Sequence, residues 1–370
     1  MLSLRLRTCS GLQSLSISKS RLAQVTTNAV RSKSVMIYKS NSNNPFFNIA
    51  FENFLLTKDR DDEDHILYLW RNGPSVIIGR FQSAWKECEV TRMEENKVNL
   101  VRRSSGGGAV YQDLNNSIFT FLGPRDKHDV SANNSIITSA LLEHSNIVAV
   151  PTGRNDIEVD GYKVSGAAFR QTGNRALHHG TLLLDVDMTA LDKYLTPNKL
   201  KMQSKGIASV SARVSNLKKF DDSLTHEGVC DAISNSFQKH HGVTCEIINV
   251  DESAALEEAS IQQMMDQLMD HDWRFGKEPA FTNNLTTRFA WGMIDIYITT
   301  KKGSVIEEVT IYSDALDTEF ITKLQEALVG SEYSKEGMKT AIDGLSQGFP
   351  LDSPSRANSG ELLTWLVESV

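Results

Sequence analysis

The segment RRSSGGGAVYQD, residues 102–113, carries most of the information about the fold and the site. Its three consecutive glycines allow the backbone to approach an anionic group closely, and their amides can donate hydrogen bonds to it. Arg102 and Arg103 stand just before them, and a guanidinium presents a planar fork of donors to phosphate or carboxylate oxygens. The segment therefore predicts an anion site, and an adenylate phosphate suits it.

Two common nucleotide-binding motifs do not match this segment. No Gly-Lys-Ser/Thr follows the glycines, as a Walker loop requires. A strand is expected at residues 109–111, where the dinucleotide fingerprint has a helix. Taken alone, the segment is equally compatible with a surface turn that carries two solvated arginines, so the surrounding sequence has to decide.

A second group of residues lies downstream, in GRNDI at 153–157 and KVSGA at 163–167. Between them, Asp160 and Gly161 predict a hairpin turn because both residues tolerate positive φ. Lys163 then stands in a run that is otherwise typical of half-buried sheet, and an ammonium there needs an anionic partner or a ligand. Lys163 is the candidate to stabilise charge on an acyl adenylate while its carbonyl is attacked; the alternative is an outward-facing lysine on an edge strand.

The pair His178 and His179 begins another expected strand. Neighbouring strand residues face opposite sides, so at most one of the two can enter the same pocket. With no carboxylate or cysteine near them they do not predict a metal site, and a structural role is the alternative. The four cysteines are widely separated, which indicates neither a metal site nor a disulfide framework.

The periodicity of the chain predicts an α+β fold. Helices are expected at 48–57, 254–269 and 317–328, and strands at 66–70, 75–79, 100–103, 109–111, 117–122, 156–159, 163–168, 178–184, 288–300 and 305–313. Many strands with few helices between them favour a large, mainly antiparallel sheet with flanking helices. Residues 348–359 are rich in turn-forming types and are expected to be a loose connection to a last short helix.

Length, charge and hydropathy limit the class of protein. A chain of 370 residues is too long for one ordinary domain, so we expect a large domain at 35–272 and a small α+β domain at 273–370. The net charge of -7 argues against a general nucleic-acid surface. No apolar run approaches the roughly 18 residues that a membrane-spanning helix needs.

Residues 1–34 have the composition of a mitochondrial transit peptide. They are rich in serine and arginine, and the first acid of the chain is Glu52. Leu2, Leu4 and Leu6 alternate with arginines in a way that suits a short basic amphipathic helix, whereas a secretory signal needs a longer apolar centre. The mitochondrial matrix is therefore the expected location; the alternative is a disordered tail.

Together these residues resemble the lipoate-protein ligase A and lipoyltransferase family, within the biotin/lipoate protein ligase catalytic-domain superfamily. The resemblance rests on residues 47–52, 75–80, 85–88, 102–113, 153–157, 163–167, 178–184, 206–209 and 216–217. Residues 273–281 and the strands near 291–292 and 309–313 resemble the small accessory domain of full-length ligases. Ser104 stands where many members have arginine and Gln112 where many have histidine, and these two departures bear on an activation half-reaction more than on transfer.

The resemblance implies a large domain in which the glycine-rich loop and Lys163 enclose lipoyl-AMP. Lys163 would be the catalytic contact to the acyl phosphate. The implied pocket consists of Arg103, Gly106, Gly107, Gly108, Ala109, Val110, Tyr111, Arg154, Asn155, Asp156, Thr181, Ala208 and Ser209, in addition to Lys163. Asp156 would orient or deprotonate an attacking amine, or bind adenine or ribose instead. No metal ligands are identified.

The implied reaction is attack of a partner's lysine amine on lipoyl-AMP, with AMP as leaving group. The implied acceptors are lipoyl domains of 2-oxo acid dehydrogenase E2 subunits and the glycine-cleavage H protein, and a monomer is expected. A ligase would first make lipoyl-AMP from lipoate and ATP with Mg; a transferase would take preformed lipoyl-AMP or a lipoyl-protein donor. An octanoyltransferase needs an activated cysteine, which the motif strands lack, and a non-catalytic lipoyl-binding protein has no chemical need for Lys163 and the glycines.

Overall fold

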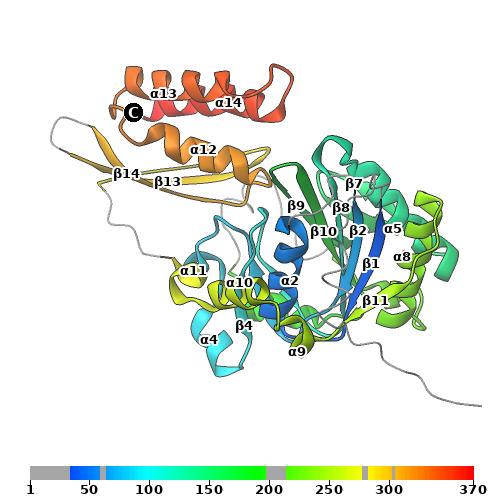
Figure 1. Cartoon of the computed structure of the whole chain (residues 1–370). Coiled ribbons are helices and arrows are strands. Elements are labelled where there is room, and N and C mark those ends of the chain that lie inside the picture. Colours follow the sequence, from blue (N-terminus) through cyan, green and yellow to red (C-terminus); the bar gives the residue numbers. More distant parts are fainter. Residues whose placement is uncertain (1–33, 59–63, 197–213, 277–281, 302–304) are drawn as a thin grey trace, which may run out of the picture.

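The computed structural model describes residues 34–58, 64–196, 214–276, 282–301 and 305–370 (Figure 1). A mixed sheet of eight strands organises the first part of the chain, in the order β11-β1-β2-β6-β10-β9-β8-β7. Its strands are β1 Val35–Ser40, β2 His65–Trp70, β6 Asn116–Pro124, β7 Val150–Thr152, β8 Asp156–Val159, β9 Tyr162–Thr172, β10 Arg175–Leu183 and β11 Ile247–Val250. Only the pairs of β1 with β11 and β2 are parallel, so the prediction of a mainly antiparallel sheet is confirmed.

A second sheet of three strands holds the glycine-rich segment. It consists of β3 Ser75–Ile78 in the centre, with β4 Asn99–Arg102 on one side and β5 Val110–Gln112 on the other. The segment 103–109 therefore crosses from one edge of this sheet to the other, past the end of β3. Gly79 makes this crossing possible, because a Cβ there would lie 2.2 Å from the carbonyl oxygen of Gly107.

Helices cover both faces of the large sheet. Helix α2 (Pro45–Thr57) packs with α10 (Ala259–Met269) over Tyr68 and Trp70, and α5 (Val130–Ser145) packs with α8 (His226–His241) over the opposite face. The shorter helices are α3 Ala84–Glu87, α4 Val90–Glu95, α6 Met188–Tyr194, α9 Glu252–Ala255 and α11 His271–Phe275, with 3-10 turns η1 Arg125–Lys127 and η3 Leu217–Lys219. Figure 1 shows α5 and α8 on the side of the sheet away from α2.

Several predicted elements differ from those observed. Helix α5 was not predicted, because its asparagines and serines resemble a loop; it forms because Asp129 caps it and Ile136, Ile137, Ala140 and Leu141 give it one buried face. The single helix predicted at 254–269 is wrong. The chain forms α9 and α10 instead, because each has its own start: the Asp251 side chain caps α9, and Glu258 begins α10.

The last part of the chain forms a small sheet with its own core. Strands β12 (Asn283–Phe289), β13 (Gly292–Thr300) and β14 (Ile306–Ser313) are antiparallel, and α12 (Thr318–Leu328) packs on them through Phe320, Ile321 and Leu324. Helices α13 (Lys335–Gln347) and α14 (Pro354–Ser369) complete the unit, which lies beside the large sheet in Figure 1.

Two predictions for this unit are wrong. The strand predicted at 288–300 is interrupted by a hairpin, since β12 ends at Phe289 and β13 begins at Gly292. Gly292 lies against Ala315, where a Cβ would be 2.8 Å from the Ala315 Cα. The loose connection predicted at 348–359 ends early, because Ser353 caps a 16-residue helix α14 that begins with Pro354. None of the helices in the described part of the chain has the length and apolar character that a bilayer crossing needs.

Candidate active site

A cavity of about 220 Å³ opens between the glycine-rich loop and the strands β8, β9 and β10. Gly107, Gly108, Ala109 and Val110 form one wall of the cavity. The opposite wall is formed by Asp156, Lys163 and Thr181 on these strands and by Arg154 and Asn155 in the turn that precedes β8. The two groups of residues singled out in the sequence therefore meet across one cavity.

Lys163 and Asp156 form an ion pair at the mouth of this cavity. The Lys163 Nζ lies 2.7 Å from the Asp156 Oδ1, and the two side chains are 35% and 31% exposed. Asp156 is thus the anionic partner that a lysine on this strand requires. The predicted turn at Asp160 and Gly161 is present, with φ of 51° and 77°, and returns β8 onto β9.

A register shift brings Lys163 and Asp156 together. Asp156 pairs with Gly166, whereas Lys163 pairs with Glu158, because the pairing is interrupted between Ile157 and Glu158. The Lys163 side chain then lies over Gly166, where a Cβ would be only 3.0 Å from its Nζ. Gly166 therefore leaves the space that the ammonium occupies.

Arg103 lines the cavity, but its donors point to the loop backbone. Its Nη2 donates to the carbonyls of Gly106 (2.6 Å) and Gly108 (2.9 Å), and its Nη1 donates to Ile77 (3.0 Å). Burial lowers the pKa of Arg103 to about 10. The expected fork toward a phosphate is therefore directed at carbonyl oxygens, and the guanidinium fixes the shape of the glycine-rich loop.

Arg102 also stabilises the backbone. Its Nε and Nη2 donate to the carbonyls of Trp273 (2.7 Å) and Arg274 (2.8 Å), and its Nη1 donates to the Gly79 carbonyl (3.2 Å). Burial lowers the pKa of Arg102 to about 10. This side chain ties the edge of the small β3-β4-β5 sheet to α11 and does not reach the cavity wall.

Two predicted pocket residues are placed elsewhere, and two lie outside the described residues. Tyr111 faces away and stacks on Tyr194 at a ring distance of 5.7 Å, because strand alternation turns Val110 and Gln112 toward the cavity. Gly106 does not line the cavity; it packs under Ala315, whose carbonyl oxygen would be 2.2 Å from a Cβ there. Ala208 and Ser209 belong to the part of the chain that is not described.

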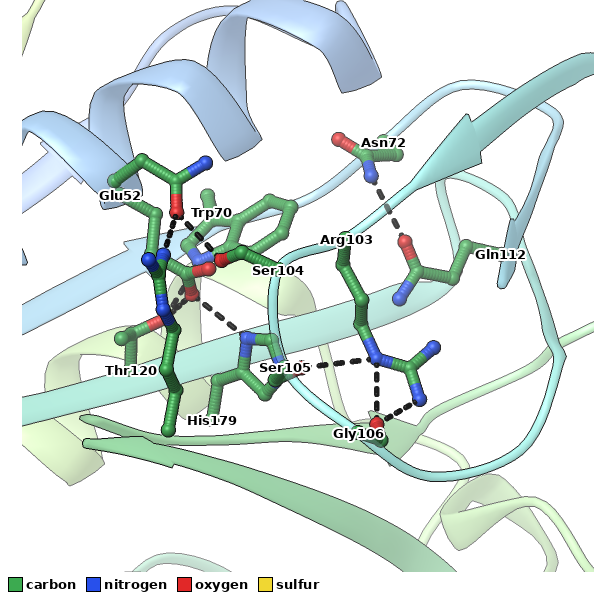
Figure 2. Close-up of polar contacts among 12 residues, drawn as sticks. Glu52, Trp70, Asn72, Arg103, Ser104, Ser105, Gly106, Gln112, Thr120 and His179 are labelled. Carbon is green, nitrogen blue, oxygen red and sulfur yellow. Dashed lines mark hydrogen bonds and ion pairs between the residues drawn. The ribbon is translucent and has the colours of Figure 1, made fainter. Parts of the chain in front are cut away.

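A buried chain of hydrogen bonds includes Trp70 and His179, which line the cavity (Figure 2). The Trp70 Nε1 donates to the Thr120 Oγ1 (3.0 Å), which donates to the Glu52 Oε1 (2.6 Å). The same carboxylate oxygen lies 2.9 Å from the His179 Nδ1, and the His179 Nε2 lies 2.8 Å from the Ser105 Oγ. All five side chains are buried.

The donor and acceptor roles of His179 follow from the hydrogen bonds that Ser105 makes. The Ser105 Oγ accepts a hydrogen bond from the Arg103 Nε, so its own proton goes to the His179 Nε2 and the His179 Nδ1 carries the proton that faces Glu52. The sequence allowed one of the two histidines to enter the pocket, and that residue is His179. His178 lies on the opposite face, fully buried, where burial lowers its pKa to about 3.

The small domain supplies three lining residues that the sequence did not predict. Arg288, Asp314 and Leu316 face the cavity. The Arg288 Nη1 lies 3.1 Å from the Asp314 Oδ2, and both side chains are 11% exposed. The Gly107 amide donates to the Ala315 carbonyl at 3.1 Å, so the connection from β14 to α12 covers the glycine-rich loop.

The thiols of the described residues are not activated. Cys88 and Cys230 are buried, and burial raises the pKa of each to about 12. Neither they nor Cys245 line the cavity. Thioester chemistry therefore lacks a nucleophile among the described residues. These residues also contain no cluster of three His, Cys, Asp or Glu side chains that could hold a metal ion.

A glycine-rich loop facing a strand lysine across a mainly antiparallel sheet defines a catalytic domain of the lipoyl ligase class. Residues 44–238 match the family model of the lipoyl protein ligase A/B catalytic domain, and residues 278–366 match that of the bacterial lipoate protein ligase C-terminus. The chain belongs to the lipoate-protein ligase A family and is an enzyme of that family.

Similar proteins span nearly the whole chain. Lipoate-protein ligase A of Psychrobacter cryohalolentis is 42% identical over 336 residues, which are 90% of this chain and 97% of that protein. Lipoate-protein ligase A of Blochmanniella pennsylvanica is 36% identical over 344 residues, 91% and 99% of the two chains. The crystal structure of P. falciparum LipL1 in complex with lipoate has a TM-score of 0.80 at 32% identity and covers 90% of this chain and all of that one.

Proposed function

We propose that this enzyme joins a lipoyl group to a lysine of an acceptor protein through lipoyl-AMP held in the 220 Å³ cavity. The proposal rests on the distribution of polar and apolar residues along the cavity. Ile49, Trp70 and Ile118 give its inner end an apolar lining, whereas Lys163 and Asp156 charge its mouth. An apolar acyl chain ending in a mixed carboxylic-phosphoric anhydride has the same distribution of polarity.

In this proposal Lys163 is the catalytic contact to the acyl phosphate. The acceptor amine attacks the carbonyl carbon, a C–N bond forms, and the bond from that carbon to the phosphate oxygen breaks, so that AMP leaves as an anion. The Lys163 ammonium stabilises the charge that accumulates on the carbonyl and phosphate oxygens. Asp156, 2.7 Å from Lys163, is placed to orient or deprotonate the incoming amine.

The remaining contacts would bind the adenylate. Gly107, Gly108 and Thr181 lie on the cavity wall, and Arg154 and Asn155 lie at its mouth. Asn155 is held in place because its Nδ2 donates to the Ala167 carbonyl at 2.5 Å. These groups supply neutral and cationic donors on both sides of an anionic phosphate.

Lipoate and ATP are the proposed source of lipoyl-AMP. The P. falciparum structure is described as a complex with lipoate. A lipoate-protein ligase A structure, which is 23% identical with a TM-score of 0.55, is described as bound with ATP. Mg²⁺ would accompany ATP and neutralise phosphate charge. A transferase that uses only preformed lipoyl-AMP or a lipoyl-protein donor is the second candidate, favoured by the occupied donors of Arg103.

The proposed acceptors are lipoyl domains of 2-oxo acid dehydrogenase E2 subunits and the glycine-cleavage H protein. A ligase from Thermoplasma acidophilum, similar in fold, is described with its E2 lipoyl domain. We further propose a monomer with domains at 35–272 and 273–370 that does not bind nucleic acid.

The basic, serine-rich residues 1–34 support a mitochondrial matrix location. Import of a reporter fused to these residues tests the location, and a reporter left in the cytosol would contradict it.

One experiment tests the reaction. The purified protein is incubated with an unlipoylated lipoyl domain and either lipoyl-AMP or lipoate with Mg-ATP, and the mass of the domain is measured. A lipoyl mass increase with both donors supports a ligase, and an increase with lipoyl-AMP alone selects the transferase. No increase with either donor would overturn the proposed function.

A further inference from the structure

Glu52 is a buried carboxylate that lies outside the proposed acyl-adenylate cavity. It stands on α2, its side chain is 2% exposed, and it is not among the residues that line the cavity. A buried charge is costly unless hydrogen bonds and opposite charges compensate it. Any effect of Glu52 on a substrate in the cavity must therefore pass through its neighbours, which Figure 2 shows.

Three neighbouring groups fix the position of this carboxylate. The Thr120 Oγ1 donates to the Glu52 Oε1 at 2.6 Å, and the Trp70 Nε1 donates to the same hydroxyl oxygen at 3.0 Å. The His179 Nδ1 lies 2.9 Å from the same carboxylate oxygen. An acceptor at Nδ1 selects the tautomer that carries the proton on that nitrogen, so the Nε2 of His179 is left as an acceptor.

His179 connects the carboxylate to the glycine-rich loop. Its Nε2 accepts from the Ser105 Oγ at 2.8 Å, and that hydroxyl oxygen accepts from the Arg103 Nε at 3.0 Å. The Arg103 Nη2 in turn donates to the carbonyls of Gly106 and Gly108. A continuous run of hydrogen bonds therefore joins helix α2 to the backbone of the loop.

The charge of Glu52 also supports Arg103. Burial lowers the pKa of Arg103 to about 10, and the negative charge of Glu52 opposes this effect. The Arg103 donors contact neutral oxygens, which are the Ser105 hydroxyl and backbone carbonyls of Ile77 and the loop. Glu52 therefore stabilises the buried guanidinium both by its charge and through the hydrogen bonds of the intervening side chains.

A second contact from α2 reaches the same loop. Asn53, the residue after Glu52, accepts a hydrogen bond from the Ser104 Oγ at 2.7 Å. Ser104 and Ser105 directly precede the three glycines, so consecutive residues of one helix hold consecutive residues of the loop. A helix is a more rigid support for a site than another loop would be.

We propose that Glu52 is a positioning residue of the active site, which acts through His179 and Ser105 to hold the glycine-rich loop in its binding conformation before the substrate arrives. The inference rests on the proposed function, because that function makes this loop a wall of the lipoyl-AMP site. A loop that is ordered in only a fraction of the molecules lowers the apparent affinity by that fraction. Glu52 therefore acts on the KM for lipoyl-AMP and not on the rate of the bound complex.

Hydrogen–deuterium exchange of the full chain without ligand tests the order of the loop. Glu52→Gln keeps the volume of the side chain but removes its charge, so the amides of residues 103–110 should exchange at least about tenfold faster than in the wild type. The matched control Asp64→Asn makes the same change at a buried carboxylate that precedes β2, at the opposite end of that strand from Trp70. The control should leave exchange in the loop unchanged, and unchanged exchange in Glu52→Gln would overturn the proposal.

Steady-state transfer from lipoyl-AMP to a lipoyl domain separates positioning from chemistry. Glu52→Gln should raise the KM for lipoyl-AMP roughly tenfold and keep kcat within about threefold of the wild type. A fall in kcat at unchanged KM would show a smaller folded fraction or a part in the chemical step, and either result would contradict positioning. A wild-type protein that transfers nothing would overturn the proposed function, while the exchange measurement would still decide whether Glu52 orders the loop.

The route from the carboxylate to the loop is tested by combining Glu52→Gln with Ser105→Ala. Both side chains contact His179, from opposite nitrogens of its ring, so each single variant breaks the same run of hydrogen bonds. In KM and in loop exchange, the double variant should resemble the more affected single variant. Effects that multiply in the double variant would show two independent roles and contradict the route.

Discussion

The change Gly166→Ala tests whether the position of Lys163, and not only its charge, supports transfer. A methyl group at residue 166 would lie 3.0 Å from the Lys163 Nζ and 3.1 Å from its Cε, whereas ordinary contacts begin near 3.4 Å. The ammonium must therefore move by about 0.4 Å or more, and misplacement by 1 Å costs about a hundredfold in rate. We expect transfer from lipoyl-AMP to fall roughly tenfold to a hundredfold, or about 1.4–2.7 kcal/mol.

Stability should respond differently, which separates positioning from folding. The neighbour that the new methyl meets is the end of a flexible side chain, and the backbone φ at Gly166 does not lie in the left-handed region. We therefore expect the free energy of unfolding to stay within about 1 kcal/mol of the wild type. The matched control Gly344→Ala, in α13 with no atom within 4 Å of the added Cβ, should keep full activity and gain roughly 0.5–1 kcal/mol.

The assay is the single-turnover rate of lipoyl transfer to a lipoyl domain, measured by mass spectrometry, with urea unfolding of the same samples. A Gly166→Ala variant that transfers at the wild-type rate would refute the positioning of Lys163 by this space. A variant that loses several kcal/mol of stability would show that the strand itself cannot accept the methyl group.

The buried cysteines, the buried histidines and the Arg103 hydrogen bonds can each be tested by experiment. Burial raises the pKa values of Cys88 and Cys230 to about 12, so iodoacetamide at pH 8 should modify them only after unfolding; prior modification would contradict this. Burial lowers the pKa values of His178 and His226 from 6.5 to about 3 and 4. As the pH falls below 6.5, these histidines take up protons in the unfolded chain before they do so in the folded one. The free energy of unfolding should therefore fall from pH 6.5 toward 4, by up to about 1.4 kcal/mol per pH unit for each histidine. The fall should be smaller in His178→Gln, and a pH dependence equal to that of the wild type would contradict the prediction. Arg103→Lys leaves loop carbonyls without donors and should lower the unfolding free energy by about 2–4 kcal/mol; an unchanged urea midpoint would refute that role.

Local chemistry made part of the site predictable from the sequence. Asp160 and Gly161 form the expected turn because both residues tolerate positive φ wherever they occur, and this turn places Lys163 beside Asp156. Lys163 stands in a run that is typical of half-buried sheet, and an ammonium there needs an anionic partner in any fold. The glycine-rich segment likewise lies at a cavity because its composition permits close backbone approach.

The site features that the sequence did not predict depend on contacts between residues far apart in the chain. Arg103 could not be recognised as a loop clamp, since its acceptors include the carbonyl of Ile77, 26 residues away. Tyr111 faces away from the cavity because it alternates with Val110 and Gln112 along β5, and the sequence alone did not indicate which of the two faces of this strand lines the cavity. Leu316 reaches the cavity through the packing of the small domain on the loop, which no local pattern encodes.

The most direct test of the proposed function is lipoyl transfer by Lys163→Ala when lipoyl-AMP is supplied. The control is Lys239→Ala, which removes an exposed lysine paired with Glu143 on the far helices. Both variants should unfold at the wild-type urea midpoint. We expect Lys239→Ala to transfer normally and Lys163→Ala to lose roughly a hundredfold to a thousandfold in rate; a Lys163→Ala rate within about twofold of the wild type would contradict the assignment of the site.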